Sequence, residues 1–472
     1  MKIIIGGTGK VGFNLASFLS IFKNDITVID NNPDVVRRVN SEIEANGILG
    51  SISNPEIQDK ANVKDADIFI ALTPCDEVNM VACQIAHSIF KVPMKMARIR
   101  NVEYKKPQWM NLFSRDHMPI DYIISPESEV AKAIRIQLNY LGMTSLTEIN
   151  DGAAHIVSVV CNNKCPFLNT DLSQLPELLP TMKFKIVAIE RAEEQSDTNR
   201  YKSEDKITFP KPTDQIYEGD EVSFICSSDQ TGYVLEAFGY TQSKCHNNII
   251  IGGGNIGQSV VEEIQNYAPQ QHICLIERDE GHALELSKKY EDVLVLHGSG
   301  LNKSIINEAM YEGGNNNIIV TTDDDETNIL APLLAHHVGQ KHIVTLLNKD
   351  IYHDIIIRYP DISIVSPKDL VVQKILSHLQ KNDVRSIHVS HDHTWQIYEV
   401  NITKTCPYVF QSIHEISLPK HIMICGIFRK EQLFLNMDDL ILNQGDRLLI
   451  AGRGNALQAI ESHFTPAYSI NI

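Results

Sequence analysis

The chain has 472 residues, 43% of them hydrophobic, and a formal net charge of −17 at pH 7. This length predicts about three to four domains, and the hydrophobic share suffices for large cores. The acidic balance disfavours nonspecific binding of nucleic acid, which requires a basic face, but it leaves open docking onto a basic surface of another protein. No sequence run approaches the ~18 apolar residues of a membrane helix, so we expect a soluble, cytoplasmic chain whose role at a membrane is peripheral.

The nine cysteines are scattered along the sequence. Cys161 and Cys165 lie four positions apart, but no second pair of potential ligands follows them. Metal sites built from cysteines usually need two such pairs. We therefore expect ordinary thiols and no metal site.

Strand and helix patterns alternate at the start of the chain. Apolar runs at 2–5, 25–30, 66–73 and 95–100 predict strands, and the stretches at 11–22, 33–43 and 77–90 predict helices. This alternation is typical of a parallel, doubly wound sheet. Right-handed crossovers then place helices on both faces of the sheet.

The same pattern occurs a second time. Residues 3–12 read IIIGGTGKVG and residues 249–257 read IIIGGGNIG, while DEVN at 76–79 matches DETN at 325–328. The offset drifts only from 245 to 249 positions, as small loop insertions would produce. An internal repeat of this kind fixes the architecture early, and we expect a second α/β unit beginning near Asn248.

Each α/β unit is followed by a helix and a smaller strand-rich module. Ser-Pro begins an apolar helical stripe at 124–138 and again at 365–379. We expect this helix to leave its sheet, from where it could cross to a neighbouring subunit. The polar stretch 193–205 predicts a solvated surface loop. The predicted fold class is α/β, with two Rossmann-like doubly wound parallel sheets, each followed by a small α+β module. The predicted domains are 1–123, 124–235, 245–364 and 365–465.

The glycine-rich turns predict nucleotide binding. Gly7 permits a sharp turn, Gly9 removes the side chain that would block a pyrophosphate, and Gly12 allows the helix to pack closely on the strand. The helix N-terminus then offers free N–H groups to the anion. The further candidate cofactor-binding residues of the two turns are Thr8, Lys10 and Val11, and Gly252, Gly254, Asn255, Ile256 and Gly257.

The first turn is not a P-loop, because Val11 rather than Ser or Thr follows Lys10 and the Gly–Lys spacing differs. The alternative to binding is a pair of tight turns that hold no ligand.

A carboxylate follows each glycine turn at the end of the second strand. Asp30 lies 18 positions after Gly12, and Glu277 lies 20 after Gly257. Such a carboxylate can accept both ribose hydroxyls and repels a 2′-phosphate, which favours NAD(H) or a plain adenine nucleotide over NADP. Arg278 weakens this inference for the second turn, and a solvated strand end is the alternative for each acid.

Polar residues also end the third strand. Ligands of open parallel sheets lie outside the carboxyl ends of the strands, which places Thr73 beside a bound nucleotide. Asp76 and Glu77 have an alternative role, because acids stabilise the first turn of a helix by themselves. Asn79 either lines the site or packs within the domain.

Arg98 and Arg100 alternate along the last strand of the first unit, so their side chains share one face. They can bind phosphate oxygens in bidentate fashion, or they are solvated arginines of an edge strand. The aligned residues of the second unit are Leu346 and Asn348. We therefore expect the two sites to bind ligand unequally, with triphosphate favouring the first.

A dehydrogenase needs an acid or base near the nicotinamide, and the sequence offers no such constellation. His117 and His155 are isolated and are interpreted as surface or packed residues.

With these motifs, the chain resembles the RCK (KTN) domain family. The glycine turns, the strand-end acids, the DExN helix starts, MVACQIAHSIF, ARIRNVEY and the small modules carry the resemblance, which covers essentially the whole chain. Two such domains in one chain are similar to the cytoplasmic regulatory subunits of bacterial Trk-type potassium-uptake systems. The resemblance departs from the family pattern at Gly50-Ser51 and Gly298-Ser299, where an acid often follows the glycine.

The resemblance implies a homodimer whose four RCK domains form a ring beneath an integral-membrane potassium transporter, at the inner membrane. It implies NAD(H) and ATP or ADP as ligands that change the ring's shape and gate transport, without catalysis. The implied site residues are Gly7, Gly9, Gly12, Asp30, Thr73, Arg98 and Arg100 in the first half, and Gly252, Gly254, Gly257 and Glu277 in the second. The alternatives are an NAD-dependent oxidoreductase with two Rossmann domains and a two-RCK regulator of another channel or antiporter.

Overall fold

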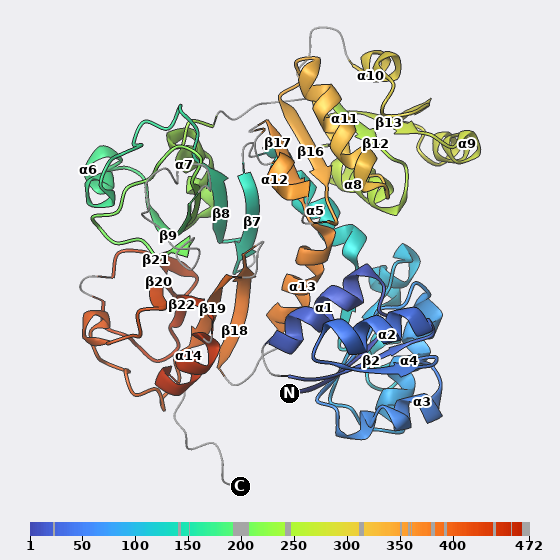
Figure 1. Cartoon of the computed structure of the whole chain (residues 1–472), viewed down its shortest axis with the longest axis horizontal. Helices are drawn as coiled ribbons and strands as arrows, with labels where there is room; N and C mark the ends of the chain where they lie inside the picture. Colours follow the sequence, from blue (N-terminus) through green and yellow to red (C-terminus); the bar gives the residue numbers. More distant parts are fainter. Residues whose placement is uncertain are drawn as a thin grey trace. The chain divides into compact units, whose positions relative to one another are not determined.

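The computed structural model describes the chain except residues 22–23, 140–142, 151, 192–206, 241–246, 311–315, 350–351, 357–358, 360, 379–382, 391–393, 438–439, 455 and 465–472. The loop predicted at 193–205 lies outside the described residues. Contacts divide the chain into two compact units (Figure 1). One unit comprises Met1–Glu129 with Pro367–Ile375, and the other comprises Val130–Ser366 with Leu376–Ile472. In the described part of the chain, no helix has both the length and the apolarity needed to cross a membrane.

A six-stranded parallel sheet forms the centre of the first unit. Its order is β3-β2-β1-β4-β5-β6, so the chain changes direction between β1 and β4, which are neighbours in the sheet. Ile3, Ile4 and Ile5 of β1 are fully buried, as expected for a strand covered on both faces. The strands are β1 Lys2–Gly6, β2 Asp25–Asp30, β3 Asn46–Leu49, β4 Ile68–Ala71, β5 Met94–Arg98 and β6 Tyr122–Ile124, and the α-helices between them are α1 Lys10–Ile21, α2 Pro33–Glu42, α3 Pro55–Lys60 and α4 Asp76–Ser88.

The second parallel sheet repeats the first, with the order β14-β13-β12-β15-β16-β17. This confirms the predicted duplication of a doubly wound unit. Its strands are β12 Asn247–Ile251, β13 His272–Glu277, β14 Leu294–His297, β15 Asn316–Val320, β16 His342–Leu346 and β17 Ile362–Val365. Its helices are α8 Asn255–Tyr267, α9 Glu280–Lys289, α10 Lys303–Ala309, α11 Asp325–His337 and α12 His353–Ile356.

Two antiparallel sheets form the small modules, in the orders β10-β9-β11-β8-β7 and β18-β19-β22-β20-β21. The first module contains β7 Met143–Ile149, β8 Ala154–Val160, α6 Leu175–Leu178, β9 Phe184–Glu190, β10 Ile207–Thr208, β11 Glu221–Ser227 and α7 Thr231–Ala237. The second contains β18 Val384–Val389, β19 Trp395–Asn401, β20 Ile422–Arg429, β21 Gln432–Phe434, β22 Arg447–Arg453 and α14 Ala456–Phe464.

Each small module contains an equivalent arginine–aspartate ion pair. Arg191 pairs with the buried Asp220, whose carboxylate also accepts a hydrogen bond from the Tyr217 N–H at 2.9 Å. In the second module Arg429 donates twice to Asp446 at 2.8 Å. These equivalent pairs give a fixed register for comparing the two modules residue by residue.

The two modules share one apolar core. Lys185 of β9 donates to the Ile424 carbonyl at 3.2 Å, and Arg447 donates to the Asn150 side chain at 2.7 Å. The modules therefore fold against each other within the chain. The buried members of this shared core are Ile149, Ala154, Ile156, Val187, Ala188, Ile207, Phe209, Ile225, Trp395, Ile397, Cys425, Phe428, Leu449 and Ala451.

The helix predicted to leave the first sheet does so. Helix α5 spans Pro126–Asn139, and from Val130 onward it belongs to the second unit. There Arg135 donates to Glu263 of α8 at 2.9 Å, and Gln137 donates to the Ile364 carbonyl of β17 at 3.0 Å. These two hydrogen bonds are thus with the second repeat of the same chain, while Ile136 packs against the core of the first small module. The matching helix, α13 Pro367–His378, contributes Pro367–Ile375 to the first unit.

Two histidines are buried in the second unit. His155 donates to or accepts from the Thr231 hydroxyl at 2.8 Å, and His388 is hydrogen-bonded to the Thr147 hydroxyl at 2.9 Å. Burial lowers the pKa of each imidazole from 6.5 to about 4. The unfolded chain therefore binds more protons than the folded chain between about pH 6.5 and pH 4, and stability falls as the pH falls through this window.

We predict that acidification from pH 7 to pH 5 destabilises the second unit through these two histidines. Each contributes about 2 kcal/mol, because one pKa unit corresponds to about 1.4 kcal/mol. Thermal unfolding followed by calorimetry at both pH values measures the change. His388→Gln should reduce the pH dependence of the midpoint, whereas substitution of the exposed His117 should leave it unchanged. An equal pH dependence in all three proteins would contradict the prediction.

Candidate nucleotide-binding sites

The first glycine turn lies between β1 and α1. Gly7 has a left-handed φ of +85°, and a Cβ there would lie 2.7 Å from the Thr73 backbone nitrogen. A Cβ on Gly12 would lie 2.1 Å from the Gly7 carbonyl oxygen, so the helix start packs directly on the turn. A Cβ on Gly9 would meet no atom within 4 Å. The three glycines therefore differ: two are required by the fold, and Gly9 faces open space.

Asp30 fixes the conformation of this turn. Its Oδ2 accepts hydrogen bonds from the Thr8 backbone N–H at 2.6 Å and from the Thr8 hydroxyl at 3.0 Å. Its Oδ1 accepts one from the Asn32 N–H at 2.8 Å. A carboxylate has about four acceptor positions, so these bonds leave Oδ1 able to accept from a ribose hydroxyl.

The second turn is built in the same way. Gly252 has a φ of +105°, and a Cβ on Gly257 would lie 1.9 Å from the Gly252 carbonyl oxygen. Glu277 Oε2 accepts from the Gly253 N–H at 2.8 Å, while Gly254 again faces open space. Asn255 and Ile256 begin α8, as Lys10 and Val11 begin α1.

His282 is a further residue of the second turn, which the sequence did not indicate. Its Nε2 lies 3.0 Å from the Gly253 carbonyl oxygen, and this hydrogen bond raises the pKa of the imidazole. Gln258 Nε2 donates to the same carbonyl at 3.0 Å. The turn is therefore held both by a carboxylate on its N–H side and by two side chains on its carbonyl side.

Asn79 connects the ends of two strands. It is fully buried, its Oδ1 accepts from the Thr73 N–H and hydroxyl at 3.0 and 2.6 Å, and its Nδ2 donates to the Thr73 and Arg98 carbonyls at 3.0 and 2.9 Å. Asn328 makes the equivalent bonds to Thr322. Of the two roles open for Asn79, the structure assigns it the packing role. Thr73 itself remains half-buried just beyond the carboxyl end of β4, next to β1.

Asp76 also has a structural contact. Its buried carboxylate accepts from the N–H groups of Arg100 and Asn101 at 3.0 and 2.9 Å. The equivalent Asp325 accepts from the Asn348 side chain at 3.0 Å. These acids therefore hold the loops that follow β5 and β16, in addition to favouring the helix start.

Arg98 and Arg100 converge on a carboxylate that the sequence analysis did not select. Arg98 Nη2 donates to Glu127 Oε1 at 2.8 Å, and Arg100 Nε lies 3.4 Å from the same oxygen. The alternative of solvated arginines on an edge strand is wrong, because β5 lies between β4 and β6 and only 15% of the Arg98 side chain is exposed. Arg100 lies beyond the end of β5 rather than within a strand.

Two opposing effects act on the guanidinium group of Arg98. Burial lowers the pKa of Arg98, and the nearby Glu127 opposes this shift. Arg98 Nε, Arg100 Nε and Glu127 Oε2 are buried without a hydrogen-bond partner. The position equivalent to Glu127, directly after Ser-Pro, is Lys368 in the second half. A comparison of these two Ser-Pro helix starts was the signal in the sequence that could have identified Glu127.

The other residues that we singled out lie outside these sites. His117 is exposed, while His155, Cys161 and Cys165 are buried in the first small module or its shared core. Among the described residues there is no group of histidine, cysteine and acidic side chains that could hold a metal ion.

We predict different results for two alanine substitutions in the first turn. Gly12→Ala should destabilise the first unit by about 3 kcal/mol, because its Cβ overlaps the Gly7 carbonyl. Gly9→Ala should change the stability by less than about 0.5 kcal/mol, because its Cβ meets no atom. Denaturant unfolding of both variants measures the difference, and equal losses would contradict the structure of the turn.

Comparison with known proteins identifies the family. The TrkA-N domain family matches residues 3–126 and 248–367, and the TrkA-C domain family matches residues 397–465. Trk system potassium uptake protein TrkA of Azorhizobium caulinodans is 33% identical over 98% of both chains. The protein of the same name from Halomonas elongata is 30% identical over 95% of both chains.

Solved structures show the same fold. The crystal structure of the GsuK RCK domain is similar with a TM-score of 0.59 and 17% identity, over 98% of this chain and 94% of that one. The GsuK channel bound to NAD has a TM-score of 0.58 and 16% identity, over 98% and 78%. These comparisons confirm the predicted RCK fold class, and the named relatives are potassium uptake proteins rather than enzymes. The chain therefore belongs to the TrkA family of potassium uptake proteins.

Proposed function

We propose that this chain is a non-enzymatic, nucleotide-sensing regulatory subunit that gates a Trk-type potassium-uptake transporter from the cytoplasmic face of the inner membrane. The observation that carries the proposal is the pair of glycine turns, each held by a strand-end carboxylate and each open at its middle glycine. An open glycine before a helix N-terminus is suited to a pyrophosphate. The names of the relatives supply the potassium-uptake context.

The proposed ligands are NAD(H) and ATP or ADP. Asp30 and Glu277 favour a ribose without a 2′-phosphate, because a carboxylate repels that group. The solved channel with this fold was obtained bound to NAD. The proposed cofactor-binding residues remain Gly7 to Gly12, Asp30, Thr73, Arg98 and Arg100, and Gly252, Gly254 to Gly257 and Glu277.

The two sites are proposed to differ in their response to phosphate. In the first site Arg98 and Arg100 share Glu127, whereas Leu346 and Asn348 occupy the equivalent positions of the second. A terminal phosphate near Arg98 would compete with Glu127 for the guanidinium group. Triphosphate binding would therefore depend on separating this ion pair, and only the first site has it.

Helix α5 gives this competition a route to the rest of the chain. Glu127 lies in its first turn, and Arg135 and Gln137 lie two turns later, hydrogen-bonded to Glu263 and to the Ile364 carbonyl. A ligand that releases Glu127 changes the constraint on the start of this helix. Such a ligand shifts the conformational equilibrium only by its difference in affinity for the two states.

The proposed assembly is a homodimer of two-domain chains that forms a ring and docks on the integral-membrane transporter subunit. Within this assembly we propose the domains 1–123, 124–235, 245–364 and 365–465. The net charge of −17 suits a basic docking surface on that partner.

The first test is calorimetric titration of the chain with NADH, NAD⁺, ATP and ADP, with NADH oxidation followed in parallel. Gly9→Ala and Gly254→Ala form a matched pair, because each Cβ enters the open space of one turn. We expect each to weaken binding at its own site at least about tenfold and to spare the other. Turnover of NADH with a small carbonyl substrate would favour the oxidoreductase instead, and equal ATP affinity in the two variants would contradict unequal sites.

The second test concerns the Arg98–Glu127 pair. We expect Glu127→Gln to strengthen ATP binding and Arg98→Gln to weaken it, each by about tenfold, since a charged hydrogen bond contributes about 1.5–3 kcal/mol. NAD⁺ binding should change less, because it has no terminal phosphate. Arg37→Gln, on the exposed face of α2, removes the same charge elsewhere and is the control. Unchanged ATP affinity in Glu127→Gln would rule out the competition.

A further inference from the structure

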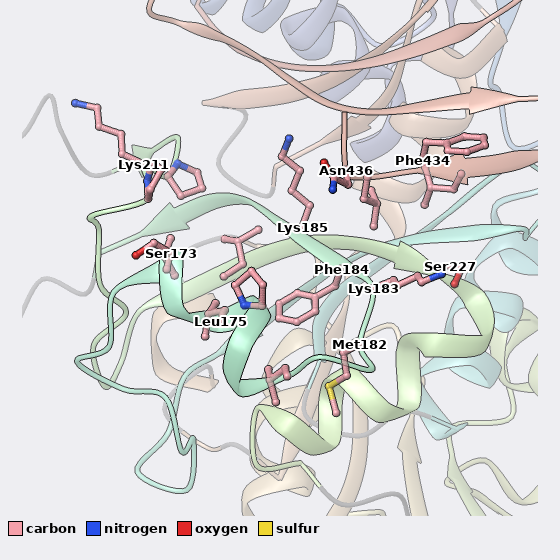
Figure 2. A pocket seen from close by; sticks show the side chains of 18 of the residues that line it. Ser173, Leu175, Met182, Lys183, Phe184, Lys185, Lys211, Ser227, Phe434 and Asn436 are labelled. Atoms are coloured by element: carbon pink, nitrogen blue, oxygen red, sulfur yellow. The ribbon is translucent and has the colours of Figure 1, made fainter. Parts of the chain in front are cut away.

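A cavity lies in the small modules, away from the glycine turns. It has a volume of about 700 Å³, within the range of small-molecule sites. The first module supplies most of its lining, from α6, the start of β9 and the loops beside them, and the second module supplies β21 and the two residues after it (Figure 2). The lining residues are Leu172, Ser173, Leu175, Pro176, Leu179, Met182, Lys183, Phe184, Lys185, Ile186, Pro210, Lys211, Pro212, Ser227, Gln432, Leu433, Phe434, Leu435 and Asn436.

Most of this lining is apolar. Leu175 is buried, and Met182, Phe184 and Phe434 are half-buried, so part of each side chain remains open to the cavity. Figure 2 shows Leu175, Phe184 and Met182 among the side chains that line the site. A ligand that fills such a cavity gains from burying apolar surface.

The charged part of the lining has a single sign. Among the described residues that line the cavity, the charged ones are Lys183, Lys185 and Lys211, and none is Asp or Glu. Lys183 and Lys211 are exposed, while Lys185 is half-buried and donates to the Ile424 carbonyl at 3.2 Å. In a chain with a net charge of −17, the charged side chains of this lining are all cationic, and the nearby Asp229, which interacts electrostatically with Lys183, lies outside the lining.

The second module provides an internal comparison. Counting back from the equivalent Arg191 and Arg429, the positions of Lys185 and Lys183 are occupied by Met423 and His421. The cavity on that side is smaller, about 340 Å³, and is lined mainly by Ile, Leu and Met side chains. Lys185 of the first module also reaches this lining, and the second module itself contributes no lysine to it. The lysines are therefore a feature of the first module and are not required by the shared fold.

We propose that this cavity binds a small amphipathic anion, with an apolar body against Leu175 and Phe184 and a carboxylate, sulfonate or phosphate group among the lysines. Because β21 belongs to the second module, a bound ligand contacts both modules and stabilises their pairing. This site is independent of nucleotide binding and gives the chain a second class of ligand.

The test uses 8-anilinonaphthalene-1-sulfonate, a fluorescent amphipathic anion, titrated into the full chain with NAD⁺ in excess. The variant Lys183→Gln with Lys211→Gln removes two cations and keeps the Lys185–Ile424 contact. Lys288→Gln with Lys303→Gln removes two exposed cations of the second nucleotide-binding domain and is the matched control. N-phenyl-1-naphthylamine, which lacks the sulfonate, separates the charge from the apolar body.

We expect one saturable site whose dissociation constant rises about fivefold or more in the Lys183/Lys211 variant and is unchanged in the Lys288/Lys303 variant. Binding of the neutral probe should be equal in all three proteins, and circular dichroism should confirm that all are folded. Equal sulfonate affinity in the two double variants, or no saturable sulfonate binding while NAD⁺ is in excess, would overturn the proposal.

Discussion

The hydrogen bond between a strand-end carboxylate and the glycine turn is the interaction on which both nucleotide-binding domains depend. Asp30 and Glu277 accept from backbone N–H groups of turns that lie 22 and 24 residues earlier in the chain. Each bond fixes the turn at the switch point, next to the end of the central strand. The middle glycine is then held open toward solvent, where a phosphate group can approach the helix N-terminus.

A comparison of the two halves distinguishes the contacts that recur in both from the residues that differ between them. The turn glycines, the strand-end carboxylate, the buried asparagine and the first-turn aspartate make equivalent bonds in both halves. The arginines, Glu127 and the lysines of the cavity do not recur, because the second half has Leu346, Asn348, Lys368, His421 and Met423. Differences between two copies in one chain arise on the same scaffold, so they indicate ligand chemistry better than they indicate stability.

Much of the fold could be predicted from the sequence, because its signals are local or repeated. The apolar runs, the glycine turns and the offset of about 245 residues were sufficient for two parallel sheets and two small modules. The contacts of the sites were harder to predict. Glu127 meets Arg98 across 29 residues, and His282 meets Gly253 also across 29, and no periodic pattern encodes either pairing.

The cavity in the small modules could not be predicted at all, for a related reason. Residues 172–186 and 432–436 line it together, about 250 residues apart in the chain, and no local pattern indicates that the two modules pack on each other. Arg98 and Arg100 contact the same oxygen of Glu127, as expected for side chains that share a face, and this common partner is the reason why we propose competition with a phosphate. Local sequence patterns therefore located candidate residues, whereas long-range packing determines which partners those residues contact.

The central claim is that nucleotide binding at the first glycine turn controls potassium uptake. The most direct measurement is potassium flux into vesicles that contain the Trk-type transporter subunit together with this chain, as ATP or NAD(H) is titrated. The account predicts a nucleotide-dependent flux with the wild-type chain, and a half-maximal concentration at least about tenfold higher with Gly9→Ala. A flux that does not depend on the nucleotide concentration, or the same half-maximal concentration with Gly9→Ala as with the wild-type chain, would contradict it.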